Sequence, residues 1–353
     1  MTIFFAILLF SFLIFIHELG HFVAAKLSGV QVNEFAIFMG PALWKKQNGE
    51  TLYAVRLIPI GGYCAMEGED GGSDNPRAFD KAAWWKKLLI LVAGAAMNFI
   101  IGVMLMVVVC LPVQQVVVPV IDSFEGYATV DDGNGLQTGD RILEVDGETI
   151  LVYSDFSLML KLNEGEVHDL VVERNGQKVV LDDFRMEKHE VVKADGTTQK
   201  LYGMNFSIAD LDFGGKLRHA WNQCLDTVRL VRLSLQMLFS GQAGLADMTG
   251  PVGIVSHMSQ VAESSESWLD AALNLLYYGA FIAINLAVMN LLPIPALDGG
   301  RVVGVLITAL VEAITRKKID PKFEGYLHGA GMILLLALMA IIMFKDIFVL
   351  FKG

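Results

Sequence analysis

Cysteine is scarce in this chain of 353 residues, and its three cysteines lie far apart in the sequence. Cys64, Cys110 and Cys224 form no CxxC pair, so they indicate neither a disulfide framework nor a zinc-thiolate site. Charged residues are also few, at 18%, and acidic residues outnumber basic ones by 38 to 27. That balance argues against nucleic acid as a partner.

Hydrophobic residues, in contrast, make up 54% of the chain, and the mean hydropathy is +0.50. They gather in four blocks, Ile3–Leu27, Leu88–Val113, Ala271–Leu292 and Gly329–Phe351. Each block has close to the ~20 residues that a helix needs to cross a ~30 Å hydrocarbon core. The first block has no basic residue before Lys26 and no small-residue cleavage site, so we expect a retained helix rather than a signal peptide. The sequence predicts an α-helical polytopic membrane protein with four transmembrane helices.

Basic residues are concentrated between the first and second blocks and between the third and fourth. The positive-inside rule then makes these two loops cytoplasmic and both termini extracytoplasmic. Between Val113 and Asp270 there are 12 Lys and Arg against 25 Asp and Glu, which indicates a solvated extracytoplasmic domain. We expect a multi-pass protein of the inner (cytoplasmic) membrane.

The first block contains an HExxH motif, His17-Glu18-Leu19-Gly20-His21. Residues four apart share a helix face, so His17 and His21 can reach one metal ion, with Glu18 turned about 100° away. Ionisable groups within a membrane span are costly and usually functional. The motif alone is short enough to arise by chance, so a third ligand is needed to support a metal site.

Three other stretches have two readings each. Glu34–Met66 has a β-hairpin pattern that is very apolar for a cytoplasmic loop, so it is either solvated or dips into the membrane. Gly94, Asn98 and Gly102 share a face of the second span, which suits either helix packing or a cavity. Pro293 and Pro295 break the third span and predict Asp298 on an extended segment near the depth of the histidines, although Asp298 could instead cap the helix that follows.

The acidic domain carries a stretch, Gly135–Gly147, that looks like the core signature of a PDZ domain. Such mainly β domains bind an extended peptide by strand addition, and the alternative is a PDZ fold that acts only as a plug or spacer.

Taken together, HELGH, the apolar hairpin, Gly94-x-x-x-Asn98, the PDZ-like stretch and Asn290-Leu291-Leu292-Pro293-Ile294-Pro295-Ala296-Leu297-Asp298-Gly299-Gly300-Arg301 resemble the site-2 protease family. The closest resemblance is to the bacterial RseP-like intramembrane zinc proteases, and it covers nearly the whole chain. It implies that the ligands of Zn²⁺ are His17, His21 and Asp298 and that Glu18 is the catalytic base. The substrate-binding residues that we expect are Asn290, Pro293, Pro295, Asn98 and, on a membrane-reentrant hairpin that clamps substrate, Tyr53, Val55 and Leu57.

This chain departs from the family pattern in two places. Family members commonly have Gly-Pro where it has Gly94-Ala95, and Gram-negative relatives usually carry two PDZ modules where this chain has room for one.

The resemblance implies cleavage of single-pass membrane proteins, such as anti-sigma factors or remnant signal peptides, within the lipid bilayer. Two other readings remain: a transporter that uses intramembrane His, Glu and Asp, although the chain shows no internal repeat, and an inactive PDZ membrane adaptor, which the intact Glu18 argues against. The expected segments are residues 1–27, transmembrane helix 1 with HExxH; 28–87, a cytoplasmic loop with the membrane-reentrant hairpin; 88–113, transmembrane helix 2; 114–210, the extracytoplasmic PDZ domain; 211–270, an extracytoplasmic helix and connector; 271–297, transmembrane helix 3; 298–328, a cytoplasmic amphipathic helix and loop; and 329–353, transmembrane helix 4.

Overall fold

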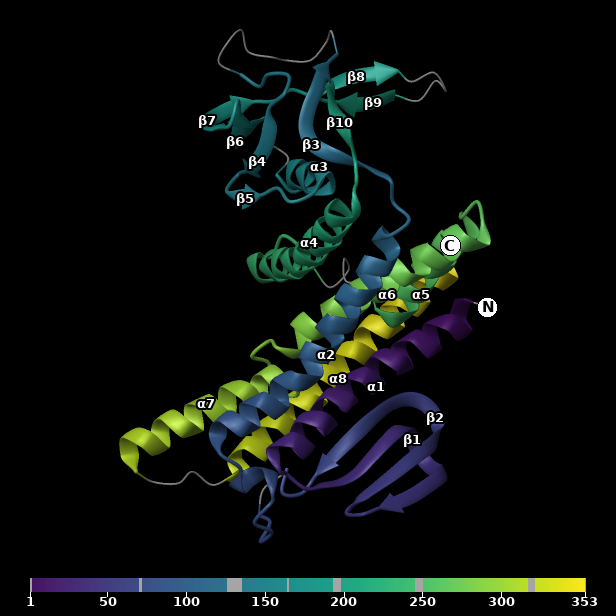
Figure 1. Ribbon diagram of the computed structural model, residues 1–353, viewed down its shortest axis with the longest axis vertical. Coiled ribbons are helices and arrows are strands. Elements are labelled where there is room, and N and C mark those ends of the chain that lie inside the picture. The colour runs from purple at the N-terminus through teal and green to yellow at the C-terminus, as the bar shows by residue number, and fades with distance from the viewer. Residues whose placement is uncertain are drawn as a thin grey trace. The chain divides into compact units, whose positions relative to one another are not determined.

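A computed structural model of the chain describes residues 2–69, 72–125, 135–163, 165–192, 198–244, 250–316 and 321–352. The chain forms two compact units, one made of Met1–Met106 with Thr227–Gly353 and the other of Val107–Asp226 (Figure 1). Parts of the predicted PDZ domain, the connector and the loop after the third span fall outside the described residues, at 126–134, 245–249 and 317–320.

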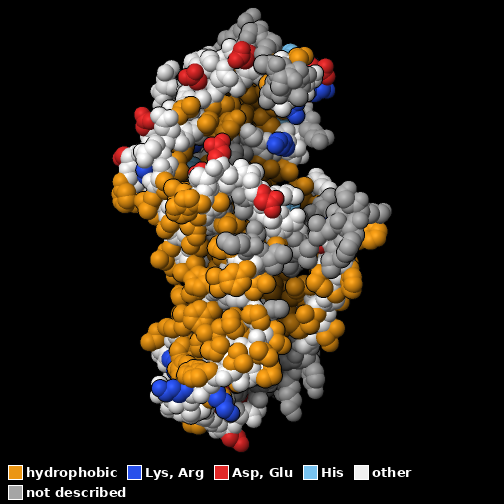
Figure 2. All heavy atoms as spheres, turned by 90° about the vertical axis from the view of Figure 1, so that its right-hand side faces the viewer, with side chains coloured by type: hydrophobic (Ala, Val, Ile, Leu, Met, Phe, Trp, Pro, Cys, Tyr) orange, Lys and Arg blue, Asp and Glu red, His pale blue; other side chains and the backbone are white. Residues whose placement is uncertain are grey.

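Four helices of the chain are long and apolar enough to cross a membrane, as the sequence predicts. Their candidate spans are Phe4–Ser28 in α1 (Thr2–Ser28), the whole of α2 (Trp84–Cys110), the whole of α6 (Trp268–Asn290) and Gly329–Asp346 in α8 (Pro321–Lys352). Further helices are α4 (Phe213–Ser240), α5 (Pro251–Glu263), α7 (Asp298–Thr315) and a short 3-10 turn, η1 (Phe79–Lys81), and α3 (Tyr153–Leu162) belongs to the second unit. Figure 2 shows hydrophobic side chains over much of the visible face of the helical unit.

The third span differs from its predicted range of 271–297, because α6 ends at Asn290. Pro293 and Pro295 follow within a turn and have no N–H to continue the helical hydrogen bonds. A new helix, α7, starts at Asp298, so this residue stands at the start of the helix that follows rather than on an extended segment.

The helices α1 and α2 cross with their backbones in contact. A side chain on Gly20 would meet the carbonyl oxygen of Ala93 at 2.3 Å and Cα of Gly94 at 2.9 Å. Such close crossings require small residues and are common between membrane helices. The contact brings α2 directly against the HELGH segment of α1.

The apolar hairpin is a sheet of two long strands, β1 (Val32–Asn48) and β2 (Thr51–Met66), and each strand folds back on itself. Gly40 has φ +83°, and the reversal there lets both halves of β1 pair with β2. In the resulting sheet, residues 34–37 pair with residues 52–55 on one side and residues 62–65 on the other. Residues 62–66 therefore form one outer edge of the sheet.

A buried apolar cluster joins this sheet to the helices. It contains Ala25 of α1, Phe35 of β1, Met66 of β2, Leu91 of α2 and Val305 of α7. The cluster packs around the HELGH segment, with Phe15, Leu19 and Phe22 of α1 against it. The first two helices, the sheet and the start of α7 thus share one core.

The second unit is mainly β. It has a six-stranded sheet in the order β10-β3-β4-β6-β7, with β5 paired to β4, together with the helix α3 (Tyr153–Leu162) and the first half of α4. The strands are β3 (Gln115–Phe124), β4 (Arg141–Val145), β5 (Glu148–Thr149), β6 (Val167–Arg174), β7 (Gln177–Arg185) and β10 (Met204–Asp210), and a separate hairpin joins β8 (His189–Val192) and β9 (Thr198–Leu201).

The stretch Gly135–Gly147 folds around a buried ion pair in this unit. Asp140 is fully buried and binds Arg174 at 2.7 Å, and its carboxylate also accepts the N–H of Gln137. Arg174 in turn donates to the carbonyl of Gly135. The pair ties the turn before β4 to the end of β6.

Candidate metal centre and active site

Three potential metal ligands that are far apart in the sequence meet in the helical unit. The Nε2 atoms of His17 and His21 lie 3.1 Å apart, and Oδ2 of Asp298 lies 3.1 Å from the first and 3.3 Å from the second. His17 and His21 belong to α1, and Asp298 is the first residue of α7. The structure thus brings together the three residues that the sequence proposes as ligands.

The spacing of these atoms fits a tetrahedral metal ion. With bonds of about 2.0 to 2.1 Å, ligand atoms in a tetrahedral zinc site lie about 3.3 Å apart. Oδ2 of Asp298 is buried and has no hydrogen-bond donor within the described ranges, so a cation would satisfy it. Two imidazoles and one carboxylate leave a fourth position open, which is typical of catalytic rather than structural zinc.

The ring nitrogens that face away from the centre have partners of their own. Nδ1 of His21 lies 2.8 Å from the carbonyl oxygen of Ile90, so it carries the proton and leaves Nε2 free for a metal. The side-chain amide of Asn290, at the end of α6, lies 3.4 Å from Nδ1 of His17. With its oxygen turned toward the ring, this amide would accept a hydrogen bond from the Nδ1–H of His17 in the same way. Asn290, expected to bind substrate, therefore lies beside a metal ligand.

Gly94 of α2 closes the site on another side. A Cβ at this position would lie 2.4 Å from Nε2 of His21 and 2.8 Å from Cε1 of His17. Only glycine leaves room for both imidazoles. The sequence singled out Gly94 for its spacing to Asn98 and Gly102, and a Cβ on Gly102 would meet Ile284 of α6 at 2.6 Å.

Glu18 lies against the outer edge of β2. Its Oε2 accepts the backbone N–H of Cys64 at 3.0 Å, and a Cβ on Gly62 would lie 3.8 Å from its Cγ. A carboxylate next in sequence to one histidine of the triad and held by a backbone donor is placed to act as a base.

The hairpin residues that the sequence proposed as substrate contacts lie in the interior of the sheet. Tyr53 pairs with both Phe35 and Lys46, and Val55 pairs with both Ile37 and Trp44. This segment has strand neighbours on both sides, because the reversal at Gly40 folds the second half of β1 over it. Leu57 lies further along the same segment with an exposed side chain.

The other proposed substrate residues have different surroundings. Asn98 is almost fully buried, and its Oδ1 has no hydrogen-bond partner in the part of the chain that the structure describes. Pro293 is exposed, whereas Pro295 packs against α8, where a Cβ on Gly331 would lie 2.4 Å from it.

Two features of this site could not be found from the sequence. One is the backbone of Gly62 and Cys64 beside Glu18, because a strand edge has no side-chain signature. The other is an ion pair between Arg301, one turn after Asp298, and Glu69, just after β2. Arg301 stands within the Asp-Gly-Gly-Arg stretch, but nothing in the sequence links it to Glu69.

Comparison with known proteins matches residues 5–338 to the model of peptidase family M50. The chain belongs to peptidase family M50. It is 35% identical to a candidate zinc metalloprotease of Clostridium acetobutylicum over 97% of this chain and 96% of that protein. It is also 28% identical to the zinc metalloprotease RasP of Oceanobacillus iheyensis, over 97% of each chain.

Membership of this family makes the protein a zinc metalloprotease of the site-2 protease type with membrane-spanning helices. The family assignment favours neither the transporter nor the inactive adaptor. Zinc, when bound, lowers the pKa of a water molecule toward ~7 and polarises a peptide carbonyl. The triad of His17, His21 and Asp298 has the donor set and spacing to hold it.

Proposed function

We propose that this M50 protease cleaves the transmembrane segments of single-pass membrane proteins, such as anti-sigma factors and remnant signal peptides. The observation that carries the proposal is the position of the candidate centre inside a candidate membrane span. His17, Glu18 and His21 all lie within Phe4–Ser28. A peptide bond that reaches them must itself lie in or beside the bilayer.

In the proposed reaction, His17, His21 and Asp298 hold the metal, and Glu18 acts as the base. Glu18 takes a proton from the attacking water and returns it to the leaving amine. The N–H of Cys64 fixes the direction of its carboxylate, so the proton acceptor is oriented before substrate arrives. Asn290 and Ile90 keep the imidazole rings oriented through their outer nitrogens.

A helical substrate hides its peptide bonds within its own hydrogen-bond ladder, so cleavage requires local unwinding. We infer that the unwound segment adds as a strand to the outer edge of β2, because this edge touches Glu18. The N–H groups of Cys64 and Met66 already bind Glu18 and Glu69. Alternate residues of a strand point to the same side, so the backbone of Gly62 faces the same edge as those of Cys64 and Met66. Because the N–H groups of Cys64 and Met66 are occupied, we place the incoming strand next to Gly62.

The surroundings of the sheet support a place within the membrane. Ser11, in the middle of α1, donates a hydrogen bond to the carbonyl of Pro59 in β2 at 3.1 Å. The sheet therefore runs beside the candidate span past the depth of His17. Leu43, Trp44 and Ile58 are exposed on it, as expected for side chains that face lipid.

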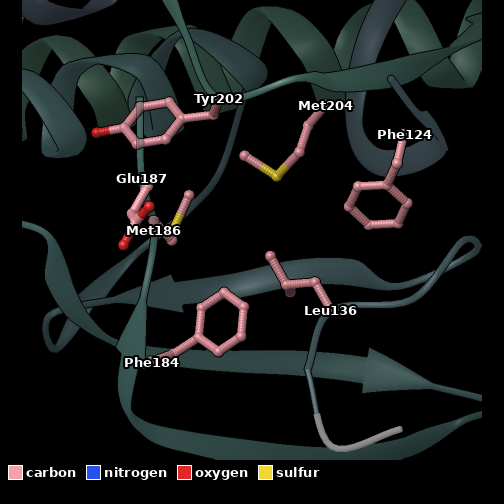
Figure 3. Close-up of a pocket in the computed structure, with 7 residues that line it drawn as sticks. All are labelled: Phe124, Leu136, Phe184, Met186, Glu187, Tyr202 and Met204. Atoms are coloured by element: carbon pink, nitrogen blue, oxygen red, sulfur yellow. The ribbon is translucent and has the colours of Figure 1, made fainter. Parts of the chain in front are cut away.

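We assign the β unit as a single PDZ domain that screens substrates. Its edge strand β10 and helix α3 border a cavity of about 400 Å³, with Tyr153 and Phe156 of α3 packed on Phe206 of β10. An extended peptide added to β10 would lie in this cavity. The neighbouring gap between Leu136, Phe184 and Met204 is only about 10 Å³ and holds at most one water molecule (Figure 3).

We further propose that the protein lies in the inner (cytoplasmic) membrane with the PDZ domain and both termini outside the cytoplasm. Basic residues of both predicted cytoplasmic loops are the basis for this orientation. Substrates trimmed on the outside would then meet the PDZ domain on the side of the membrane where they were trimmed.

Comparative membrane proteomics of cells with the wild-type protein and with Glu18→Gln tests this function. Single-span fragments should accumulate in the variant, because the zinc site is intact but no base remains. Identical fragment profiles in the two strains would contradict the proposal. Gln at this position keeps the size of the side chain and an oxygen that can accept the N–H of Cys64.

A further inference from the structure

The ion pair between Arg301 and Glu69 joins two segments that each carry part of the candidate active site. Arg301 lies three residues after Asp298 in α7, and Glu69 follows β2 by three residues. The two side chains are only 18% and 24% exposed, so water screens them less than a surface pair. A hydrogen bond between a guanidinium and a carboxylate is charge-assisted, and such bonds are stronger than those between neutral groups.

Glu69 is bound to the sheet as well as to Arg301. Its second carboxylate oxygen accepts the backbone N–H of Met66 at 3.3 Å. Two residues earlier, the N–H of Cys64 donates to Glu18 at 3.0 Å. Neighbouring donors on one strand edge thus hold the proposed base through Cys64 and the partner of Arg301 through Met66.

The first turn of α7 also packs closely against the backbone of the segment that follows α6. A Cβ on Gly299 would lie 2.3 Å from the backbone of Leu291, and one on Gly300 would lie 2.3 Å from the carbonyl oxygen of Ile294. The turn after α6 therefore supports α7 from one side, and the pair of Arg301 with Glu69 connects it to β2.

From this geometry, and on the basis of the zinc protease function proposed above, we infer that Arg301 and Glu69 are positioning residues. They hold the Asp298 ligand and the Glu18 base at a fixed separation, although the two residues belong to separate helices. The continuous path runs from Asp298 through one turn of α7 to Arg301, to Glu69, along the edge from Met66 to Cys64, and to Glu18.

The test measures zinc affinity by chelator competition and, separately, kcat and KM on a single-span substrate, for purified full-length variants. In Glu69→Gln the side chain keeps its shape and an acceptor for Met66 but loses its charge. We expect it, like Arg301→Gln, to bind zinc about tenfold more weakly, in line with partners that orient metal ligands. We also expect kcat to fall in both single variants, while KM stays within twofold of the wild-type value. In the double variant Arg301→Glu with Glu69→Arg the pair is reversed, and we expect its zinc affinity to recover to within threefold of the wild type.

Arg77→Gln is the matched control, since it breaks an ion pair with Glu50, in the turn between β1 and β2, that lies outside the path from Asp298 to Glu18. We expect it to keep wild-type zinc affinity. Wild-type zinc affinity and kcat in both single variants would overturn the inference, as would a reversed pair that folds with the wild-type unfolding temperature but binds zinc no better than the single variants. A wild-type protein that binds no zinc would instead overturn the proposed metal site.

Discussion

Replacement of Gly94 by alanine tests the packing of α2 against the metal ligands. The new Cβ would lie 2.4 Å from Nε2 of His21, whereas comfortable contact needs about 3.5 Å. The imidazole or the helix must therefore move by about 1 Å. Metal sites tolerate displacements of only about 0.2 Å.

We expect zinc affinity in Gly94→Ala to fall by about 10- to 100-fold. This is the range observed when a group that orients a metal ligand is removed. That loss corresponds to about 1.4 to 2.8 kcal/mol. Chelator competition on the purified protein measures it, with cleavage of a single-span substrate as a second readout.

Gly102→Ala is the control for general helix packing on the same face of α2. Its Cβ would first meet the flexible side chain of Ile284, at 2.6 Å. We expect a small loss of stability and unchanged zinc affinity. Wild-type zinc affinity and activity in Gly94→Ala would refute the close approach of α2 to the histidines.

Three further predictions concern the two units and the metal. Arg174→Met leaves Asp140 buried without its cation, so hydrogen exchange in β4 and β6 should report a loss of about 3 to 5 kcal/mol; unchanged exchange would contradict the buried pair. Hydrogen bonds from Arg77 and, second, from Lys26 lower the pKa of Glu50 to about 2. The stability that Glu50 adds to the β1–β2 sheet is therefore complete above pH ~4.3 and is lost as the pH falls toward 2. The anisotropy of a dye at the β1–β2 turn should fall over that range in the wild type but not in Glu50→Gln. Chelation of zinc should abolish cleavage and lower the unfolding temperature, because zinc at a thousand times its Kd stabilises the folded state by about 4 kcal/mol.

The local part of the candidate site could be predicted from the sequence. The spacing of His17 and His21 follows directly from helical periodicity, and the four spans follow from hydropathy. The position of Asp298 beside them rested on resemblance, because it depends on how α6, the proline turn and α7 fold back. Of the two readings of Asp298, the start of a helix agrees with the structure and the extended segment does not, because two prolines mark the end of one helix but do not tell where the next begins.

The sheet shows the limit of sequence reasoning more clearly. Alternation and the Asn48-Gly49 turn indicate a hairpin, but the identity of its outer edge depends on the reversal at Gly40 and on long-range pairing. The sequence therefore pointed to Tyr53 and Val55 as substrate-binding residues of the hairpin, whereas Cys64 provides the contact with Glu18. Backbone donors and pairs such as Arg301 with Glu69 become visible only when distant segments meet.

Cleavage of a single-span membrane protein by the purified, zinc-loaded enzyme tests the central claim most directly, with the cut site located by mass spectrometry. The account predicts that the wild type cuts within the transmembrane segment and that Glu18→Gln, which keeps the zinc, does not. Full cleavage by Glu18→Gln, or cuts confined to the soluble part of the substrate, would contradict it.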